Sequence, residues 1–199
     1  MSDYTPDYEA QERKRTALVA DVSALLDPRD ASIAERVVDH FCMLSPPMSP
    51  PVLMHMIRLN DFGRGGGESR KPGNLALNWH RLKREFPDIV MNTAGAIAVP
   101  WLIPFAALSI WNKVSSQATI ELRKEHSTCL CAMWFRCDQN HHIDRETALR
   151  ESGELFRIYG WPPLTGLQFD SYLQDLVAIE CIEITNQQIW LREWIRKNY

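Results

Sequence analysis

Hydrophobic positions in the C-terminal part of the chain recur at strand spacing in some stretches and at helix spacing in others. Alternating apolar and polar residues predict strands, and apolar residues three or four apart predict helices. The predicted order is strand, helix, helix, helix, strand, strand, over residues 118–122, 124–137, 145–159, 165–180, 181–184 and 189–195. Asp144 and Thr165 are predicted N-caps, Gly160 ends the second helix, and residues 185–188 turn the final hairpin.

The N-terminal part of the chain is predicted to be helical, apart from an arm and two connectors. Its helices are expected over residues 18–26, 31–42, 52–59 and 74–86. Residues 1–17 are polar and predict a loose arm, with the start of a short helix as the alternative. The proline-rich stretch 45–51 and the glycine-rich stretch 63–73 predict connectors, and Pro87 is expected to stop the fourth helix.

Residues 89–112 form a run of 24 uncharged residues between Asp88 and Lys113. This run is long enough to span a bilayer as one helix. Pro100 and Pro104 interrupt it, and they would leave backbone groups without partners inside lipid. We therefore expect two shorter segments buried in the centre of a helical domain, and we keep a membrane span as the alternative.

The order of elements over residues 118–199 resembles the winged helix-turn-helix superfamily. The resemblance implies a mainly α fold with an N-terminal helical region over 18–117 and an α+β winged-helix domain over 118–199. Many members of this superfamily bind DNA through the third helix and the wing. Others, such as the small winged-helix partners of SMC-type ATPases, use the same surfaces for protein contacts.

The predicted third helix, residues 165–180, has the wrong charge for reading DNA. It carries Asp170, Asp175 and Glu180 and no Lys or Arg. Because DNA binding gains much of its free energy from phosphate neutralisation, an acidic helix favours a protein partner. The candidate protein-binding residues on its predicted outer face are Gln168, Asp170, Gln174 and Asp175.

The most basic stretch of the chain covers residues 58–84, which hold seven bases against two acids. We expect it to be a solvated connection, with anion binding as the alternative. The candidate phosphate-binding residues are Arg64, Arg70, Lys71, Arg81, Lys83 and Arg84. The stretch is not a P-loop, because Lys71 is followed by Pro72 instead of Ser or Thr. The net charge of the whole chain is −3, which argues against a general nucleic-acid-binding protein.

Cysteine and histidine residues gather in the predicted first helix and the turn after it. The candidate metal ligands are His126, Cys129, Cys131, Cys137, His141 and His142. Structural zinc prefers paired ligands on loops, whereas Cys129 and Cys131 lie two apart on a helix and point to different sides. We therefore expect no metal and no cofactor. Adjacency of Cys137, Asp138 and His141 does not make a catalytic triad, so we expect no catalytic residue.

These patterns together predict a non-enzymatic accessory or adaptor subunit in a larger assembly, of which an ATPase-containing complex is one kind. The odd number of cysteines, five, and their irregular spacing predict free thiols in a cytoplasmic protein. Two alternatives stay open. One is a DNA-binding regulator that contacts phosphates through residues 58–84, and the other is a membrane-anchored sensor or effector with residues 89–112 in the bilayer.

Overall fold

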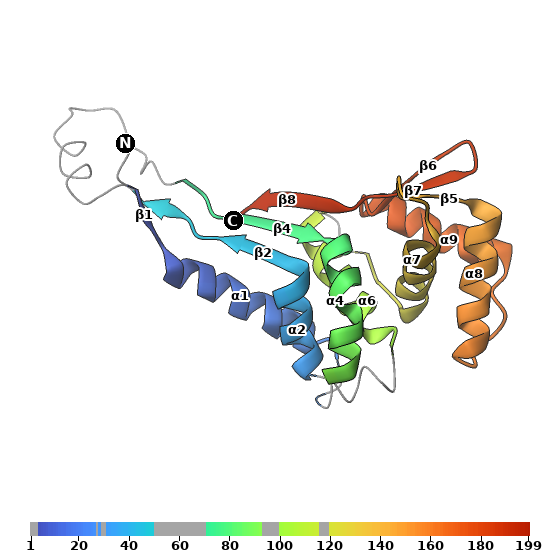
Figure 1. Cartoon of the computed structure of the whole chain (residues 1–199), viewed down its shortest axis with the longest axis horizontal. Coiled ribbons are helices and arrows are strands. Elements are labelled where there is room, and N and C mark those ends of the chain that lie inside the picture. Colours follow the sequence, from blue (N-terminus) through green and yellow to red (C-terminus); the bar gives the residue numbers. More distant parts are fainter. Residues whose placement is uncertain (1–3, 27, 29–30, 50–70, 93–99, 116–119) are drawn as a thin grey trace.

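The computed structural model describes residues 4–26, 28, 31–49, 71–92, 100–115 and 120–199, and within them the chain is a mixed α+β protein with a helical majority (Figure 1). The helices are α1 (Tyr8–Ser23), α2 (Ala31–Phe41), α4 (Trp79–Asn92), α6 (Leu102–Ser115), α7 (Lys124–Arg136), α8 (Arg145–Ile158) and α9 (Gly166–Ala178). The strands are β1 (Thr5–Pro6), β2 (Cys42–Ser45), β3 (Met48–Ser49), β4 (Asn74–Asn78), β5 (His142–Asp144), β6 (Ile182–Thr185), β7 (Gln188–Leu191) and β8 (Trp194–Asn198).

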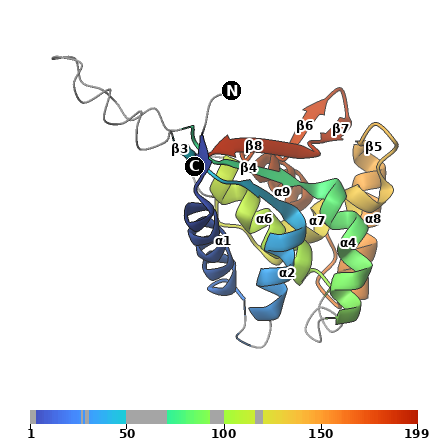
Figure 2. The same ribbon diagram turned by 60° about the vertical axis from the view of Figure 1, so that its left-hand side comes forward.

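Strands β2, β4 and β8 form a three-stranded antiparallel sheet with β4 in the middle. Leu77 of β4 pairs with Cys42 of β2 and with Ile195 of β8, and all three side chains are buried. Helices α1, α2, α4 and α6 lie on one side of this sheet (Figure 2). The last strand of the chain therefore completes a sheet whose other strands come from the N-terminal half.

The second three-stranded sheet has the order β5, β7, β6 and is also antiparallel. Helices α7, α8 and α9 pack beside it, with α7 in contact with both α8 and α9. Asn186 and Gln187 join β6 to β7 with positive φ angles of 49° and 68°. Two successive residues with positive φ are typical of the tight turns whose twist matches that of the flanking strands. The predicted turn over residues 185–188 is confirmed.

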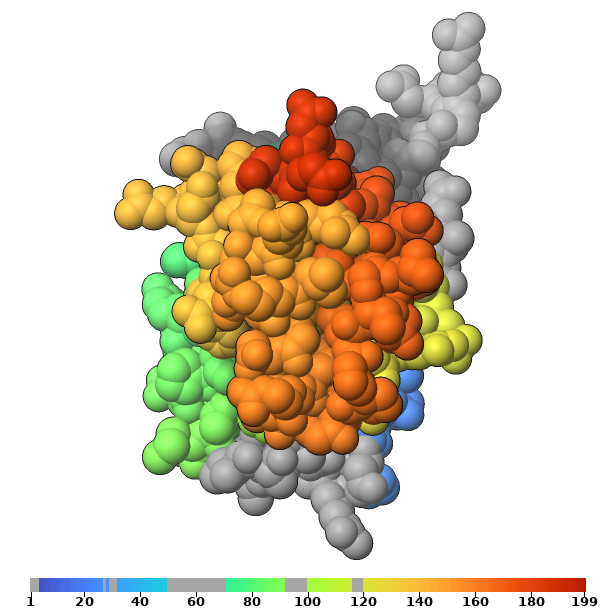
Figure 3. Space-filling view, turned by 90° about the vertical axis from the view of Figure 1, so that its right-hand side faces the viewer, coloured from blue at the N-terminus to red at the C-terminus, as the bar shows by residue number. Residues whose placement is uncertain are grey.

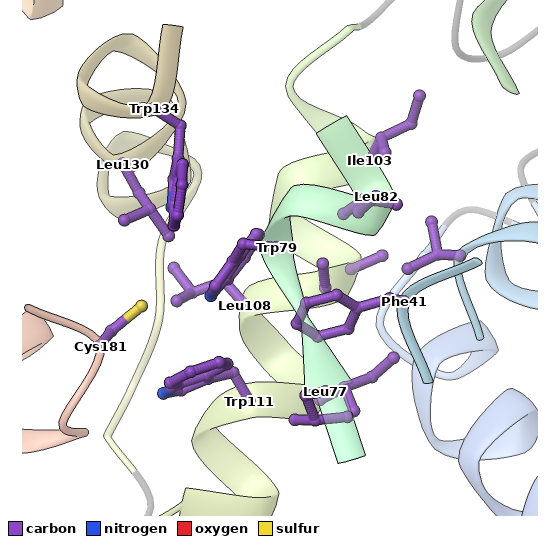
Figure 4. Packing of buried hydrophobic residues seen from close by; sticks show 14 of the residues in the cluster. Phe41, Leu77, Trp79, Leu82, Ile103, Leu108, Trp111, Leu130, Trp134 and Cys181 are labelled. Carbon is purple, nitrogen blue, oxygen red and sulfur yellow. The ribbon is translucent and has the colours of Figure 1, made fainter. Parts of the chain in front are cut away.

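One hydrophobic core joins the two halves of the chain. Phe41, Trp79 and Trp134 come from three different helices, and the ring of Trp79 lies 4.7 Å from that of Phe41 and 6.5 Å from that of Trp134 (Figure 4). Trp111 of α6 packs 5.9 Å from Trp79, and Cys181 points toward this cluster from the end of the α9 segment. Aromatic pairs of this kind contribute about 0.5–1.5 kcal/mol each beyond the area that they bury.

Three predictions for the N-terminal half are wrong, one in the type of element and two in where a helix begins or ends. Residues 74–78, expected to be helical, form β4, because they pair with strands on both sides. The side chain of Asn78 then accepts a hydrogen bond from the backbone N–H of Arg81 and caps α4. Pro87 does not stop this helix but lies inside it, and α4 continues to Asn92. Helix α1 begins at Tyr8, so residues 8–17 of the expected polar arm are helical.

Two strand predictions for the C-terminal half are also wrong. Residues 120–122 of the expected first strand are not in a strand, and residues 118 and 119 lie outside the described residues. The third strand of the sheet is instead β5, which follows α7. The expected strand over 189–195 is divided into β7 and β8, which belong to different sheets. The three helices between these strands are confirmed, with Asp144 and Thr165 as side-chain caps of α8 and α9.

The uncharged segment 89–112 is divided between two helices, as expected for buried core. Ile89 lies on the buried face of α4, and Ile103, Leu108 and Trp111 of α6 are fully buried. In the described part of the chain, no helix has both the length and the apolarity needed to cross a bilayer. Residues 93–99 and the predicted helix 52–59 lie outside the described residues.

Candidate protein-binding surface on helix α9 and the hairpin after it

Helix α9 is held in place by a capping box and by one buried stripe. The hydroxyl of Thr165 accepts a hydrogen bond from the backbone N–H of Gln168, and the side-chain oxygen of Gln168 accepts one from the backbone N–H of Thr165. Phe169, Leu173 and Leu176 are buried against the core. The opposite face of α9 is therefore turned to solvent next to the β6–β7 hairpin (Figure 3).

A shallow hollow of about 560 Å³ lies between α9 and the β6–β7 hairpin. Its walls combine apolar and polar groups from both elements and from the start of α8. The lining residues are Arg145, Asp170, Leu173, Gln174, Val177, Ala178, Ile184 and Gln187. We call this hollow, together with the exposed residues of α9 and of the β6–β7 hairpin, the α9–hairpin surface.

Asp170 lies on the α9–hairpin surface in a two-oxygen ion pair with Arg145. The guanidinium group donates from Nη2 to Oδ1 at 2.6 Å and to Oδ2 at 2.8 Å, and from Nε to Oδ1 at 2.9 Å. Arg145 is the first residue of α8, so the pair fixes the start of α8 against α9. This bidentate pair uses both carboxylate oxygens of Asp170. Fewer hydrogen-bond acceptor sites are therefore left for a basic residue of a partner protein.

Asp175 is also paired within the chain, with the buried His126 of α7. The distance from His126 Nε2 to Asp175 Oδ2 is 2.9 Å, and His126 Nδ1 accepts a hydrogen bond from the backbone N–H of Arg123. Because Nδ1 is an acceptor, the imidazole proton lies on Nε2 and is donated to Asp175. Both ring nitrogens are thus occupied in joining α7 to α9.

The two remaining carboxylates of this region share one base. Arg192 donates to Glu180 Oε2 at 3.1 Å and to Glu183 Oε1 at 2.9 Å. Residues 165–191 contain four acids and no Lys or Arg. Every acid on α9 and the hairpin therefore has a base or a histidine from the same chain as its partner, and the surface is closer to neutral than its composition predicts.

Apolar side chains of α9 and of the hairpin are also exposed to solvent beside these paired groups. Val177 and Ile184 line the hollow and are 40% and 43% exposed, and Leu167 at the start of α9 is 85% exposed. Gln174 is exposed between them and makes no side-chain hydrogen bond to the rest of the described chain. The surface thus offers apolar contact area and amide hydrogen bonding, the mixture found in protein interfaces.

The four residues predicted for protein binding all lie on or near this surface, but they are not equivalent. Gln168 is exposed and takes part in the cap, Asp170 is ion-paired with Arg145, Asp175 is hydrogen-bonded to His126, and Gln174 alone of the four is unengaged. Val177 and Ile184 were not among the residues predicted from the sequence. The sequence does mark both positions, because each is an apolar residue that lies outside the predicted buried stripe.

The candidate phosphate-binding residues do not gather at one described site. Arg64 and Arg70 lie outside the described residues. Lys71 lies over the ring of Tyr4 with its Nζ 4.4 Å from the centroid. The other three bases make contacts within the chain: Arg81 with the carbonyls of Asp39 and Cys42, Lys83 with the carbonyl of Trp134, and Arg84 with Glu85.

The thiols of Cys42, Cys129 and Cys181 are buried and those of Cys131 and Cys137 are partly buried, and desolvation shifts their ionisation. Desolvation raises the pKa of Cys42, Cys129 and Cys131 to about 12, and it raises the pKa of Cys137 as well. Thiols with raised pKa values are poor nucleophiles and poor metal ligands at neutral pH.

The candidate metal ligands and catalytic residues either make other contacts within the chain or lie apart from one another. In the described part of the chain, no three ligand-type side chains lie close enough to hold one metal ion. The carboxylate of Asp138 accepts hydrogen bonds from the backbone N–H groups of Asn140 and His142, so it shapes the turn before β5. These backbone bonds lower the pKa of Asp138. The ring of His141 packs on Trp134, and its Nε2 lies 3.7 Å from Glu193.

No protein-family model, characterised protein sequence or solved structure matches this chain.

Proposed function

We propose that this chain is a non-enzymatic accessory or adaptor subunit of a larger assembly, and that its part from α7 to β7 is a winged helix that binds a protein. The element order supports this proposal. Helices α8 and α9 follow one another across the connection 159–165, and the β6–β7 hairpin follows α9 directly. Strand β5 widens the hairpin to a three-stranded sheet.

The single observation that carries the proposal is the charge state of the α9–hairpin surface. The four acids of α9 and the hairpin are paired inside the chain, residues 165–191 contain no Lys or Arg, and Val177 and Ile184 are exposed beside Gln174. A DNA-binding surface needs cations that can replace the counterions of the phosphates. Exposed apolar groups among neutral amides suit a protein interface instead.

The proposal changes the role expected of Asp170 and Asp175. Both side chains hold neighbouring helices together, so they define the shape of the surface. Contact with the partner falls mainly to Val177, Ile184, Gln174 and Leu167. Replacing Asp170 or Asp175 with Lys would disturb the packing of α8 or α7 on α9 and would not isolate binding.

The test is purification of the tagged full chain from its native cells under non-denaturing conditions, followed by mass spectrometry. We expect one or a few proteins to be recovered in a fixed ratio to the chain. A parallel titration with fluorescent duplex DNA at about 150 mM salt, where exposed charges are screened beyond about 8 Å, is expected to show no saturable binding. Saturable DNA binding that substitution of Lys71 abolishes would favour the DNA-binding regulator and contradict the proposal.

A further inference from the structure

Among the described residues, strand β8 is an edge strand, and no described strand pairs with one side of its backbone. Its described partner is β4, in a register that sets Leu77 opposite Ile195 and Leu75 opposite Lys197. Gly73 and Tyr199 exchange two backbone hydrogen bonds, and the N–H of Trp79 donates to the carbonyl of Glu193. The strand therefore points the backbone groups of its odd-numbered residues toward β4.

The alternation of an antiparallel ladder fixes the direction of the remaining groups. If residues 193, 195, 197 and 199 face β4, the N–H and C=O groups of Trp194, Arg196 and Asn198 face away from it. No described strand pairs with that side, and the three side chains are exposed. An unpaired, exposed edge of this kind is a template for another strand.

The side chains along β8 give the edge a definite chemistry. Arg196 and Lys197 are exposed, no ion-pair partner for them occurs among the described residues, and the strand contains no acid. Trp194, at the start of the strand, is 55% exposed. On the open face of the sheet, Arg196 stands in one row with Ala76 of β4 and Met43 of β2.

We propose that the free edge of β8 binds an extended acidic segment of a partner protein as a fourth strand of the β2–β4–β8 sheet. The partner's backbone pairs with Trp194, Arg196 and Asn198. Carboxylates on the added strand lie beside Arg196 and Lys197, and an apolar side chain packs on Trp194. Main-chain hydrogen bonds provide affinity in this mode of recognition, and the alternating side chains provide specificity.

A second copy of the chain is a poorer match to the same edge. It would bring two more bases to an edge that already carries two, and β8 is only five residues long. Stable dimer interfaces bury about 1,200 Å² or more, which one short strand pair does not provide. Unlike charges on neighbouring strands stabilise a sheet, and like charges destabilise it. The edge is also separate from the α9–hairpin surface, so the two proposals can fail independently.

The test is titration of the ¹⁵N-labelled full chain with two eight-residue peptides. In the first, two adjacent Glu residues are flanked by Val and Thr, so that one Glu lies on each face of the added strand, and in the second Lys replaces both Glu residues. We expect the acidic peptide to bind about fivefold or more tightly than the basic one, because two cross-strand charge pairs change sign between them. The amide signals of Trp194, Arg196 and Asn198 should shift most.

Two variants of the chain test separately whether the open backbone and the basic side chains of β8 are needed for peptide binding. In Arg196→Pro, the lost N–H is one that faces away from β4, so the sheet is retained while strand addition is blocked. In Arg196→Glu with Lys197→Glu, the edge stays open but should prefer the basic peptide. Equal affinity for both peptides, shifts that map away from β8, or an edge occupied by self-association would overturn the proposal.

Discussion

The indole N–H of Trp111 donates a hydrogen bond to the backbone carbonyl of Ile179 over 3.0 Å, in the buried interior between α6 and the end of α9. The two residues are 68 positions apart. Through this bond the apolar helix of the N-terminal half fixes the end of the helix that presents the α9–hairpin surface. The position of that surface therefore depends on the packing of both halves.

Replacement of Trp111 with Phe should lower the free energy of unfolding by about 1–3 kcal/mol, because the carbonyl of Ile179 loses its buried partner. Urea denaturation followed by circular dichroism measures the change. The matched control is Trp194→Phe, in which the replaced side chain is 55% exposed and little should change. Equal effects of the two substitutions would contradict the role given to the Trp111 hydrogen bond.

The Arg145–Asp170 pair should contribute little to stability despite its good geometry. Its side chains are 28% and 43% exposed, and ion pairs in such positions contribute about 0–1 kcal/mol. A double-mutant cycle with Arg145→Met and Asp170→Asn, measured by urea denaturation, gives the coupling free energy directly. A coupling of several kcal/mol would show that the pair holds α8 on α9 far more strongly than its exposure suggests.

Asp144 should make the stability of the chain depend on pH in the acid range. Its carboxylate accepts a hydrogen bond from the backbone N–H of Thr147 at the start of α8, and hydrogen bonding with Thr147 lowers the pKa of Asp144. A lowered folded-state pKa stabilises the fold above the unfolded pKa of about 3.9, and this contribution is lost as the pH falls through the folded pKa.

The variant Asp144→Asn isolates that contribution, since Asn caps the helix without a charge. The native chain should be more stable than the variant at pH 7, and the difference should begin to shrink near pH 4 and disappear once the pH is below the folded-state pKa. Urea denaturation of both proteins across this range provides the measurement. A difference in the free energy of unfolding that grows as the pH falls would contradict the effect expected of the Asp144 carboxylate.

The buried thiols should be protected from alkylation in the folded state. Cys129 and Cys181 are fully buried and Cys42 is 6% exposed, and burial raises the pKa of all three. Brief treatment with iodoacetamide at pH 8 should leave these three unlabelled, and the same treatment in urea should label them. Peptide mapping by mass spectrometry distinguishes the sites, and rapid native labelling of Cys181 would contradict the burial of the α9 end.

Local patterns predicted the helices well because each helix depends on residues close in sequence. The buried stripe of α9 and the caps Asp144 and Thr165 follow from spacing and side-chain type alone. Strands β4, β5 and β8 were missed or placed wrongly because each has only three to five residues and is defined by its partners. The partner of β8 is β4, far upstream in the chain, and no local pattern contains that pairing.

The candidate site was predicted in its location and not in its chemistry. An outward position for Asp170 and Asp175 follows from helical spacing. Their partners Arg145 and His126 lie 25 and 49 residues away on other helices, so composition alone presents these carboxylates as unpaired charge. Val177 and Ile184 gain their importance only when α9 and the hairpin are placed side by side.

The most direct test of the central claim compares protein capture by two variants that place Glu at exposed apolar positions, one on the α9–hairpin surface and one away from it. Val177→Glu with Ile184→Glu places charge in the hollow, and Ile158→Glu does the same at a 65% exposed apolar residue at the opposite end of α8 from Arg145. Both variants should fold with unchanged circular dichroism. In quantitative mass spectrometry of native purifications, the first variant should lose roughly tenfold or more of the co-purifying protein, since substitution at the centre of an interface often costs 2 kcal/mol or more, and Ile158→Glu should retain it. Equal recovery by both variants would contradict the assignment of the α9–hairpin surface as the binding site.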